Sequence, residues 1–193
     1  MNISAVLLAG GESRRMGTDK AKFLFRGKPL WQVQLETLRR LRPAEIFVSA
    51  RTDPSWRPND VQFIADIPPS CGPLSGLAAC LDRVKTTHLL VLAVDMPLMT
   101  NEYLQFLCSG IEPARGAVPK IGNRAEPLAA IYPREAALYI GSVLTGSDFS
   151  LQSLIGHLVT AGKLLEISVA DHYKDLFLNV NEFSDLRVCS QGN

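Results

Sequence analysis

An apolar run that ends in a long cationic loop constrains this chain more than any other feature. Ile3–Leu8 is almost wholly apolar and is closed by Gly10 and Gly11, a pattern typical of a buried strand that runs into a loop. The two glycines allow backbone N–H groups to approach a ligand closely. The loop also carries three cations: Arg14, Arg15 and Lys20. Arginine donates two parallel hydrogen bonds to phosphate oxygens and lysine adds a compact charge, so the stretch predicts a polyphosphate site.

Two common phosphate-binding loops do not fit this stretch. Gly27 and Lys28 are followed by Pro29, so the chain has no Gly-x4-Gly-Lys-[Ser/Thr] loop. Gly10 and Gly11 are adjacent, which excludes the Gly-x-Gly-x-x-Gly dinucleotide fingerprint. A longer and more cationic loop is suited to a nucleoside triphosphate.

The whole loop resembles a known family signature. Residues 8–20 follow the pattern Leu-Ala-Gly-Gly-x-Ser-Arg-Arg-Met-Gly-x-Asp-Lys. This pattern is similar to that of the MobA-like nucleotidyltransferases, and most closely to the molybdenum cofactor guanylyltransferases. The resemblance implies that GTP is bound by the start of the loop and by its lysine: Leu8, Ala9, Gly10, Gly11 and Lys20. It also implies four catalytic residues: Arg14, Arg15, Lys20 and Asp95.

Composition narrows the class of protein further. The chain has 193 residues, of which 47% are hydrophobic, so it can form a sizeable core in a single domain. A net charge of +1 argues against non-specific nucleic-acid binding. We see no signal peptide and no membrane-spanning stretch, and expect a cytoplasmic protein without a membrane partner. The four cysteines lack zinc-site spacing and are expected to be reduced thiols, with a nucleophilic Cys71 as the minor alternative.

The order of apolar segments predicts an α/β fold. Strands are expected over residues 3–8, 45–50, 61–65 and 88–94, and helices are expected to start near Pro29, Pro73 and Thr100. This alternation predicts a Rossmann-like, mostly parallel sheet with helices on both faces. We expect one nucleotidyltransferase domain over residues 1–193, with a nucleotide-binding half over about 1–100 and an acceptor-binding half over about 101–193.

The second half of the chain has a less regular pattern. Segments 117–121 and 128–132 flank Gly122 and Asn123, which is consistent with a hairpin or with a longer paired excursion. Further elements are expected beyond them: a helix opened by Pro133, a helix capped by Ser150, a strand over 164–169 and a terminal helix over 182–188.

Two aspartates stand at predicted strand ends, where open α/β sheets bind ligands. Asp95 follows a strongly apolar strand, and a carboxylate there is suited to Mg²⁺, although a turn or helix cap would look the same. Asp66 suits a base amine or a ribose hydroxyl, or is a simple turn residue. The resemblance implies that Asp95 is the magnesium ligand and that Asp66 contacts the guanine nucleotide.

Other positions gain a role only through the resemblance. Gly72 and Gly76 match a family Gly-Pro-Leu-x-Gly stretch, and Asn179 and Asn181 match an Asn-Val-Asn stretch near the C-terminus. We assign these four to acceptor binding; otherwise they read as a helix start and turn-forming asparagines. Ser49 stands where many family members have asparagine, and we expect it to contact the nucleotide through a shorter side chain.

The implied reaction transfers GMP from GTP to the terminal phosphate of Mo-molybdopterin, forming molybdopterin guanine dinucleotide and releasing pyrophosphate. It implies Mg²⁺ as cofactor, and a cofactor-delivery protein or molybdoenzyme as partner. An acceptor phosphate is already ionised near pH 7, which agrees with a sequence that has no Ser/His/Asp or Cys/His constellation.

Three alternatives stay open at this point: a cytidylyltransferase that makes molybdopterin cytosine dinucleotide, a sugar-phosphate nucleotidyltransferase, and a non-catalytic nucleotide-binding regulator. Guanine is favoured because Gly10 follows Ala9, where cytidylyl relatives tend to carry Ala-Ala-Gly, and because of the closing Asn-Val-Asn.

Overall fold

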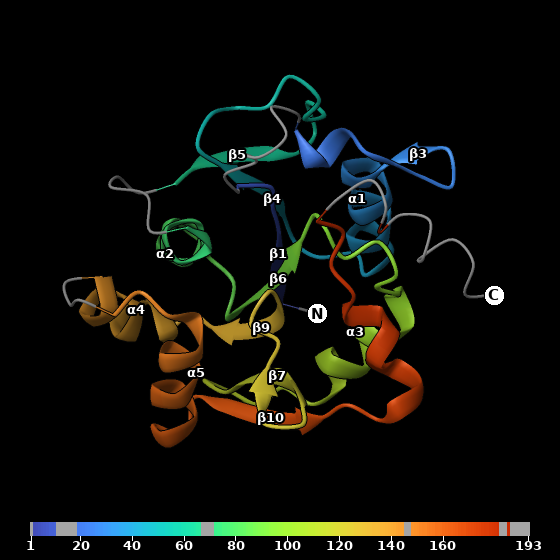
Figure 1. Cartoon of the computed structure of the whole chain (residues 1–193). Coiled ribbons are helices and arrows are strands. Elements are labelled where there is room, and N and C mark those ends of the chain that lie inside the picture. The colour runs from blue at the N-terminus through green and yellow to red at the C-terminus, as the bar shows by residue number, and fades with distance from the viewer. Residues whose placement is uncertain (1, 11–18, 67–71, 145–147, 182–184, 186–193) are drawn as a thin grey trace.

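The computed structural model describes residues 2–10, 19–66, 72–144, 148–181 and 185. One large sheet dominates these residues, with the strand order β10-β7-β9-β6-β1-β4-β5 (Figure 1). The strands of this path are β1 (Ile3–Leu8), β4 (Ile46–Ala50), β5 (Gln62–Ala65), β6 (His88–Ala93), β7 (Gly116–Ile121), β9 (Ala129–Pro133) and β10 (Leu164–Ser168). A short strand, β8 (Arg124–Ala125), pairs only with β7.

Strand β1 lies in the middle of the parallel part of the sheet. It pairs in parallel with β6 on one side and with β4 on the other, and β4 pairs in parallel with β5. Every residue of β1 and of β6 is buried, as expected for strands covered on both faces. The carboxyl ends of all four strands therefore meet at one edge of the sheet.

The sheet divides the core into two apolar layers (Figure 1). Helices α1 (Leu30–Arg40) and α3 (Asn101–Ser109) cover one face, together with the 3-10 helix η2 (Asp171–Phe177). Helices α2 (Pro73–Arg83), α4 (Ala136–Leu144) and α5 (Leu151–Thr160) cover the other. The prediction of a mostly parallel α/β sheet with helices on both faces is confirmed.

The second half of the chain resolves the choice between a hairpin and a longer excursion. Strand β7 forms a local hairpin with β8 around Gly122, whose φ of 58° suits a glycine. The chain then returns as β9, which inserts between β7 and β6 and runs antiparallel to both. Because β9 is apolar along its whole length, burial between two strands is its favourable place.

One sequence expectation about proline is corrected, and the other, a helix that starts near Pro29, is confirmed. Pro133 does not open a helix: it ends β9 opposite His88, and α4 begins at Ala136. Pro29 precedes α1 in an extended conformation and pairs with Leu24 in a small hairpin, β2 (Leu24–Phe25) and β3 (Lys28–Pro29). A proline can end a ladder because it lacks only the N–H donor, so its position did not decide the element.

Two further expectations concern the C-terminal helix and membrane-spanning segments. The expected terminal helix over 182–188 lies outside the described residues apart from Asp185. Within the described part of the chain, no helix is both long enough and apolar enough to cross a membrane.

Candidate functional site

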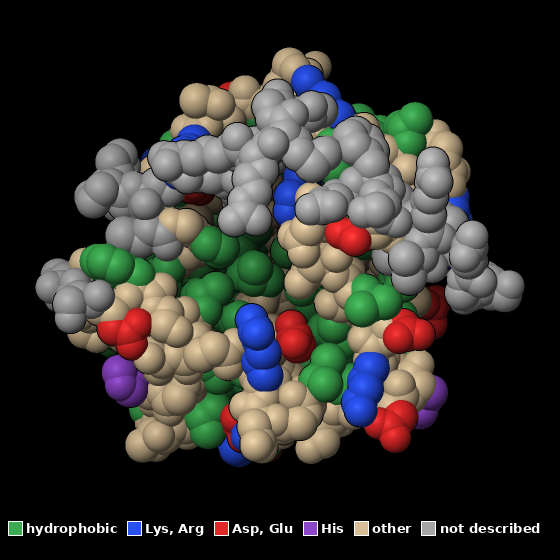
Figure 2. Space-filling model, in the orientation of Figure 1, with side chains coloured by type: hydrophobic (Ala, Val, Ile, Leu, Met, Phe, Trp, Pro, Cys, Tyr) green, Lys and Arg blue, Asp and Glu red, His purple; other side chains and the backbone are tan. Residues whose placement is uncertain are grey.

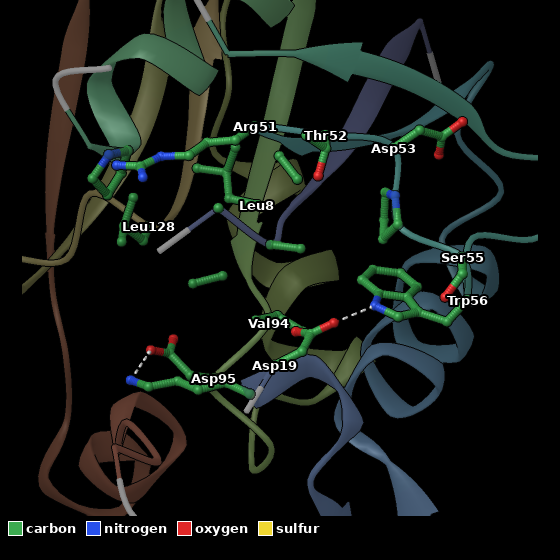
Figure 3. A pocket seen from close by; sticks show the side chains of 17 residues that line it. Leu8, Asp19, Arg51, Thr52, Asp53, Ser55, Trp56, Val94, Asp95 and Leu128 are labelled. Carbon is green, nitrogen blue, oxygen red and sulfur yellow. Dashed lines mark hydrogen bonds and ion pairs between the residues drawn. The ribbon is translucent and has the colours of Figure 1, made fainter. Parts of the chain in front are cut away.

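A pocket of about 700 Å³ opens where β1, β4 and β6 end (Figure 3). Residues that follow the carboxyl ends of neighbouring parallel strands share this edge, which is where α/β sheets bind ligands. The end of β1 contributes Leu8, Ala9 and Gly10, and the end of β6 contributes Ala93, Val94 and Asp95. The remaining wall comes from Asp19 and Lys20, from residues 50–56 after β4, and from Pro73 and Leu128. Figure 2 shows apolar side chains gathered in the hollow at the centre of this face, with basic and acidic side chains beside it.

A charged cluster forms one side of the pocket. The Lys20 ammonium donates to Asn181 Oδ1 at 2.9 Å and lies 3.7 Å from Asp95 Oδ2. Lys20 belongs to the 3-10 helix η1 (Lys20–Lys22), Asp95 follows β6, and Asn181 follows η2, so three distant segments meet here. The side chains of Lys20 and Asp95 are 27% and 24% exposed, and both can therefore reach a ligand in the pocket.

Backbone contacts hold Asp95 in place. Its carbonyl accepts from the Val180 N–H at 2.8 Å, which ties the C-terminal segment to the end of β6. The next carbonyl, that of Met96, accepts from the side chain of Gln34, a fully buried residue of α1. The carboxylate of Asp95 is thus presented by a turn that is anchored on both sides.

The electrostatics of Asp95 suit a cation. Burial raises the pKa of the Asp95 carboxyl above its usual range, and the charge of Lys20 only partly opposes that rise. The described residues hold no cluster of three or more metal-binding side chains of the His, Cys, Asp or Glu type. A single carboxylate is consistent with Mg²⁺, which takes hard oxygen ligands and shares its coordination with substrate phosphates. The donor present therefore fits a magnesium ion bound together with a nucleotide.

A second acidic group, Asp66, lies at the end of β5. The hydroxyl of Ser49, a fully buried residue of β4, donates to Asp66 Oδ1 at 3.0 Å. Burial raises the pKa of Asp66, while the Ser49 hydrogen bond and the charge of Arg51 act in the opposite direction. Because Ser49 donates to Asp66, we propose that it acts on a nucleotide by orienting that carboxylate.

Two glycines leave room for this carboxylate. A Cβ at Gly10 would lie 2.9 Å from Asp66 Oδ2, and a Cβ at Gly76 would lie 3.0 Å from Asp66 Oδ1. The same Cβ at Gly76 would lie 2.8 Å from Ser49 Oγ. Any larger residue at either position would displace Asp66 or its partner.

The structure brings together only part of the predicted site. Leu8, Ala9, Gly10, Lys20 and Asp95 line one pocket. Gly76 packs against Asp66 and Ser49, on the side assigned to the nucleotide rather than to the acceptor.

The other predicted residues either do not line this pocket or lie outside the described residues. Gly72 precedes α2 with a φ of 67°. Asn179 is exposed and is not among the described residues that line the pocket. Gly11, Arg14 and Arg15 lie outside the described residues, as does Cys71, so their roles stay predictions.

Sequence reasoning missed the wall of the pocket formed by residues 51–56. No role was predicted for this polar stretch between the strands expected at 45–50 and 61–65, although it leaves the same sheet edge as the loops after β1 and β6. Within this wall, the Trp56 indole N–H donates a hydrogen bond to Oδ2 of Asp19, another pocket residue, at 2.8 Å (Figure 3). A tryptophan within a polar loop after a parallel strand was the available signal.

The fold, with its acidic and basic groups around a pocket at the strand ends, defines a nucleotide-binding α/β protein. Comparison with known proteins makes this specific: the chain belongs to the MobA-like NTP transferase family, whose domain model matches residues 5–161. It is accordingly a nucleotidyltransferase.

Two of the relatives that match nearly the whole chain illustrate the relationship. A probable molybdenum cofactor guanylyltransferase of Opitutus terrae is 31% identical, over 95% of this chain and 92% of its own length. The molybdenum cofactor guanylyltransferase of Syntrophotalea carbinolica is 30% identical, over 94% of this chain and 88% of its own.

Solved structures support the fold at lower identity. Molybdopterin-guanine dinucleotide biosynthesis protein A of Archaeoglobus fulgidus superposes with a TM-score of 0.77 at 23% identity, and covers 97% of each chain. The 2-C-methyl-D-erythritol 4-phosphate cytidylyltransferase of Thermus thermophilus superposes with a TM-score of 0.65 at 17% identity, over 96% of each chain. Since the same fold serves enzymes named for different nucleobases, the fold alone does not determine the base.

Proposed function

We propose that this nucleotidyltransferase transfers GMP from GTP to the terminal phosphate of Mo-molybdopterin, with release of pyrophosphate. The observation that carries the proposal is the meeting of Lys20, Asp95 and Asn181 beside the pocket at the end of β1. A cation and a partly buried carboxylate, side by side at a strand edge, are suited to a nucleotide triphosphate and its metal ion. The names of the two relatives support the choice of nucleotide and acceptor.

The chemistry needs alignment and charge neutralisation more than proton transfer. An ionised oxygen of the acceptor phosphate attacks the α-phosphorus of GTP, the bond from that phosphorus to the bridging oxygen breaks, and pyrophosphate leaves. Lys20 places a positive charge beside the phosphates and stabilises the charge that develops on the leaving group. Asp95 would hold Mg²⁺, which neutralises phosphate charge when bound.

We infer the choice of guanine from Asp66, which lies against Gly10 of the pocket wall but is not among the described lining residues. An ionised carboxylate accepts hydrogen bonds, and guanine offers both its N1–H and its 2-amino group as donors on one edge. Gly10 keeps Asp66 Oδ2 unobstructed, whereas an alanine Cβ would lie 2.9 Å from that oxygen. We infer that Ser49 keeps the carboxylate turned toward the base by donating to its other oxygen.

The test is pyrophosphate release by the purified protein with Mg²⁺ and each of the four nucleoside triphosphates, without an acceptor, with Mo-molybdopterin or with a sugar 1-phosphate. We expect release only with GTP and the pterin together. Release with CTP and the pterin would identify a cytidylyltransferase. Release with a sugar 1-phosphate would identify a sugar-phosphate nucleotidyltransferase instead. Binding of GTP without release under any condition would support a regulator.

The product of the proposed reaction is a finished cofactor. A cofactor-delivery protein or a molybdoenzyme must therefore receive it. A pull-down with the protein loaded with product tests this step separately from the transfer itself.

A further inference from the structure

Trp56 connects three parts of the chain at the pocket. It lies in the segment after β4 and lines the pocket, and its ring stacks on Trp31 of α1 with centroids 5.4 Å apart and an interplanar angle of 13°. Its indole N–H donates to Asp19 Oδ2 at 2.8 Å (Figure 3). One side chain therefore joins the outer wall of the pocket to α1 and to the segment just before η1.

The Asp19 carboxylate uses its two oxygens for two different partners. Oδ1 accepts from the Ala21 N–H at 3.0 Å and caps η1, while Oδ2 accepts from Trp56. Lys20 is the first residue of η1, so its backbone is held by this cap. A hydrogen bond to Oδ2 fixes the rotation of the carboxylate and with it the position of the Lys20 backbone.

The segment that carries Trp56 is itself well anchored. The Arg57 guanidinium makes two hydrogen bonds to Asp53, at 2.7 and 2.8 Å, and also donates to the carbonyl of Val61. Asp53 and Trp56 both line the pocket. Trp56 is thus a fixed support rather than a side chain on a free loop.

We propose that Trp56 is a positioning residue for nucleotide binding: through Asp19 it holds Lys20 against the phosphate side of the pocket. This inference rests on the proposed function only in taking the ligand to be a nucleoside triphosphate. Trp56 does not belong to the signature loop (residues 8–20) and is distinct from the two strand-end aspartates, Asp66 and Asp95.

The matched pair of variants is Trp56→Phe and Trp31→Phe. Trp56→Phe keeps an aromatic ring to stack on Trp31 but removes the donor to Asp19. Trp31→Phe makes the same change of side chain in the same stacked pair but leaves that donor intact, and Trp31 is not among the described residues lining the pocket. The chain has only these two tryptophans, so the pair isolates the hydrogen bond from the stacking.

The readouts are the dissociation constants for the magnesium complexes of GTP and CTP, measured by calorimetry, and the KM and kcat of transfer. We expect Trp56→Phe to raise the dissociation constant and the KM of the nucleotide about 5- to 10-fold, the effect of losing one hydrogen bond of ordinary strength. Trp31→Phe should stay within about twofold of the unchanged protein, because the donor to Asp19 remains. A purely structural role would instead lower kcat through the fraction of folded protein and leave KM unchanged.

A Lys20→Met background tests whether the effect passes through Lys20. If it does, adding Trp56→Phe to Lys20→Met should weaken nucleotide binding less than about twofold, since coupled residues are not additive. A full additive loss in that background would overturn the inference, as would equal losses in Trp56→Phe and Trp31→Phe.

Failure of the proposed function gives a different result. If the unchanged protein binds CTP and not GTP, the base is wrong, while the ratio between the two tryptophan variants still measures the role of Trp56 with CTP. If it binds no nucleoside triphosphate, both proposals fall.

Discussion

The two ends of the strand order, β5-β4-β1-β6 and β9-β7-β10, contribute differently to the pocket. On one side, β5, β4, β1 and β6 run parallel, and the segments that follow β1, β4 and β6 deliver almost every residue that lines the pocket. On the other side, β9 runs antiparallel between β6 and β7, and only the residue before it, Leu128, enters the lining. The Leu128 carbonyl accepts from the Ala93 N–H at 2.8 Å, at the very end of β6.

Charges follow the same division. Near the parallel strands, Lys20 and Asp95 face a pocket and are only about a quarter exposed. Across the sheet, Lys120 of β7 pairs at 2.7 Å with Glu166 of the neighbouring β10. Strand direction is not the cause, because β7 and β10 also pair in parallel. Lys20 and Asp95 line a pocket at the strand ends, whereas Lys120 and Glu166 neutralise each other between two strands.

The largest expected effect is at Asp95. Asp95→Ala should lower guanylyl transfer about 100-fold or more, because the proposed metal carboxylate is lost from the site. The free energy of unfolding should change by only about 1 kcal/mol, because no large apolar side chain is removed. Pyrophosphate release and thermal unfolding measure the two quantities.

Normal transfer by Asp95→Ala would contradict the metal assignment. Asp95→Asn is the control, since it keeps the size and removes the charge. It should lose nearly as much activity as the alanine variant.

A smaller effect is expected for Gly10→Ala. Its new Cβ would lie 2.9 Å from Asp66 Oδ2, so the carboxylate must leave the position in which we propose that it contacts the base. We expect kcat/KM for GTP to fall about 10-fold, in line with the loss of one charge-assisted hydrogen bond. The ratio of GTP to CTP use should fall as well, and an unchanged ratio would remove Asp66 from base selection.

The pH dependence of Ser49→Ala tests whether Ser49 controls the ionisation of Asp66. The Ser49 hydrogen bond favours the ionised form of Asp66, so its removal raises the pKa of Asp66 further. As pH falls, Asp66 takes up a proton sooner in the variant and can no longer accept from guanine. The KM for GTP should therefore begin to rise at a higher pH than in the unchanged protein, in a titration from pH 8 downward.

Ser49→Thr keeps a hydroxyl and serves as the control for that titration. Coincident pH profiles for all three proteins would show that Ser49 does not orient Asp66.

The smallest effect is expected on the other side of the sheet. Lys120→Ala removes a partly exposed ion pair with Glu166, which should cost about 0.5 kcal/mol of stability and leave the KM for GTP unchanged. The KM for the pterin acceptor is the informative measurement. A large rise in the KM for the pterin would place the acceptor phosphate at the ends of β7 and β10. Both ends of the strand order would then contribute to substrate binding.

The sequence by itself determined the parts of this protein that depend on local patterns. The apolar run Ile3–Leu8, the glycines after it, and the aspartates that close β5 and β6 are all readable in order along the chain. Since parallel strands end at one edge, these positions were enough to predict a mostly parallel α/β sheet and a ligand site at that edge. The division into nucleotide and acceptor halves stays a prediction.

Only the tertiary structure decided which side chains meet. Asn181 lies 161 positions from Lys20 yet accepts its hydrogen bond, the buried hydroxyl of Ser49 turns to Asp66, and Trp56 reaches Asp19 across the pocket wall. The place of β9 between β6 and β7 was equally open in the sequence, because its apolar residues suit several neighbours. Contacts between distant segments depend on strand order and on helix packing, and neither leaves a periodic signal in the amino-acid sequence.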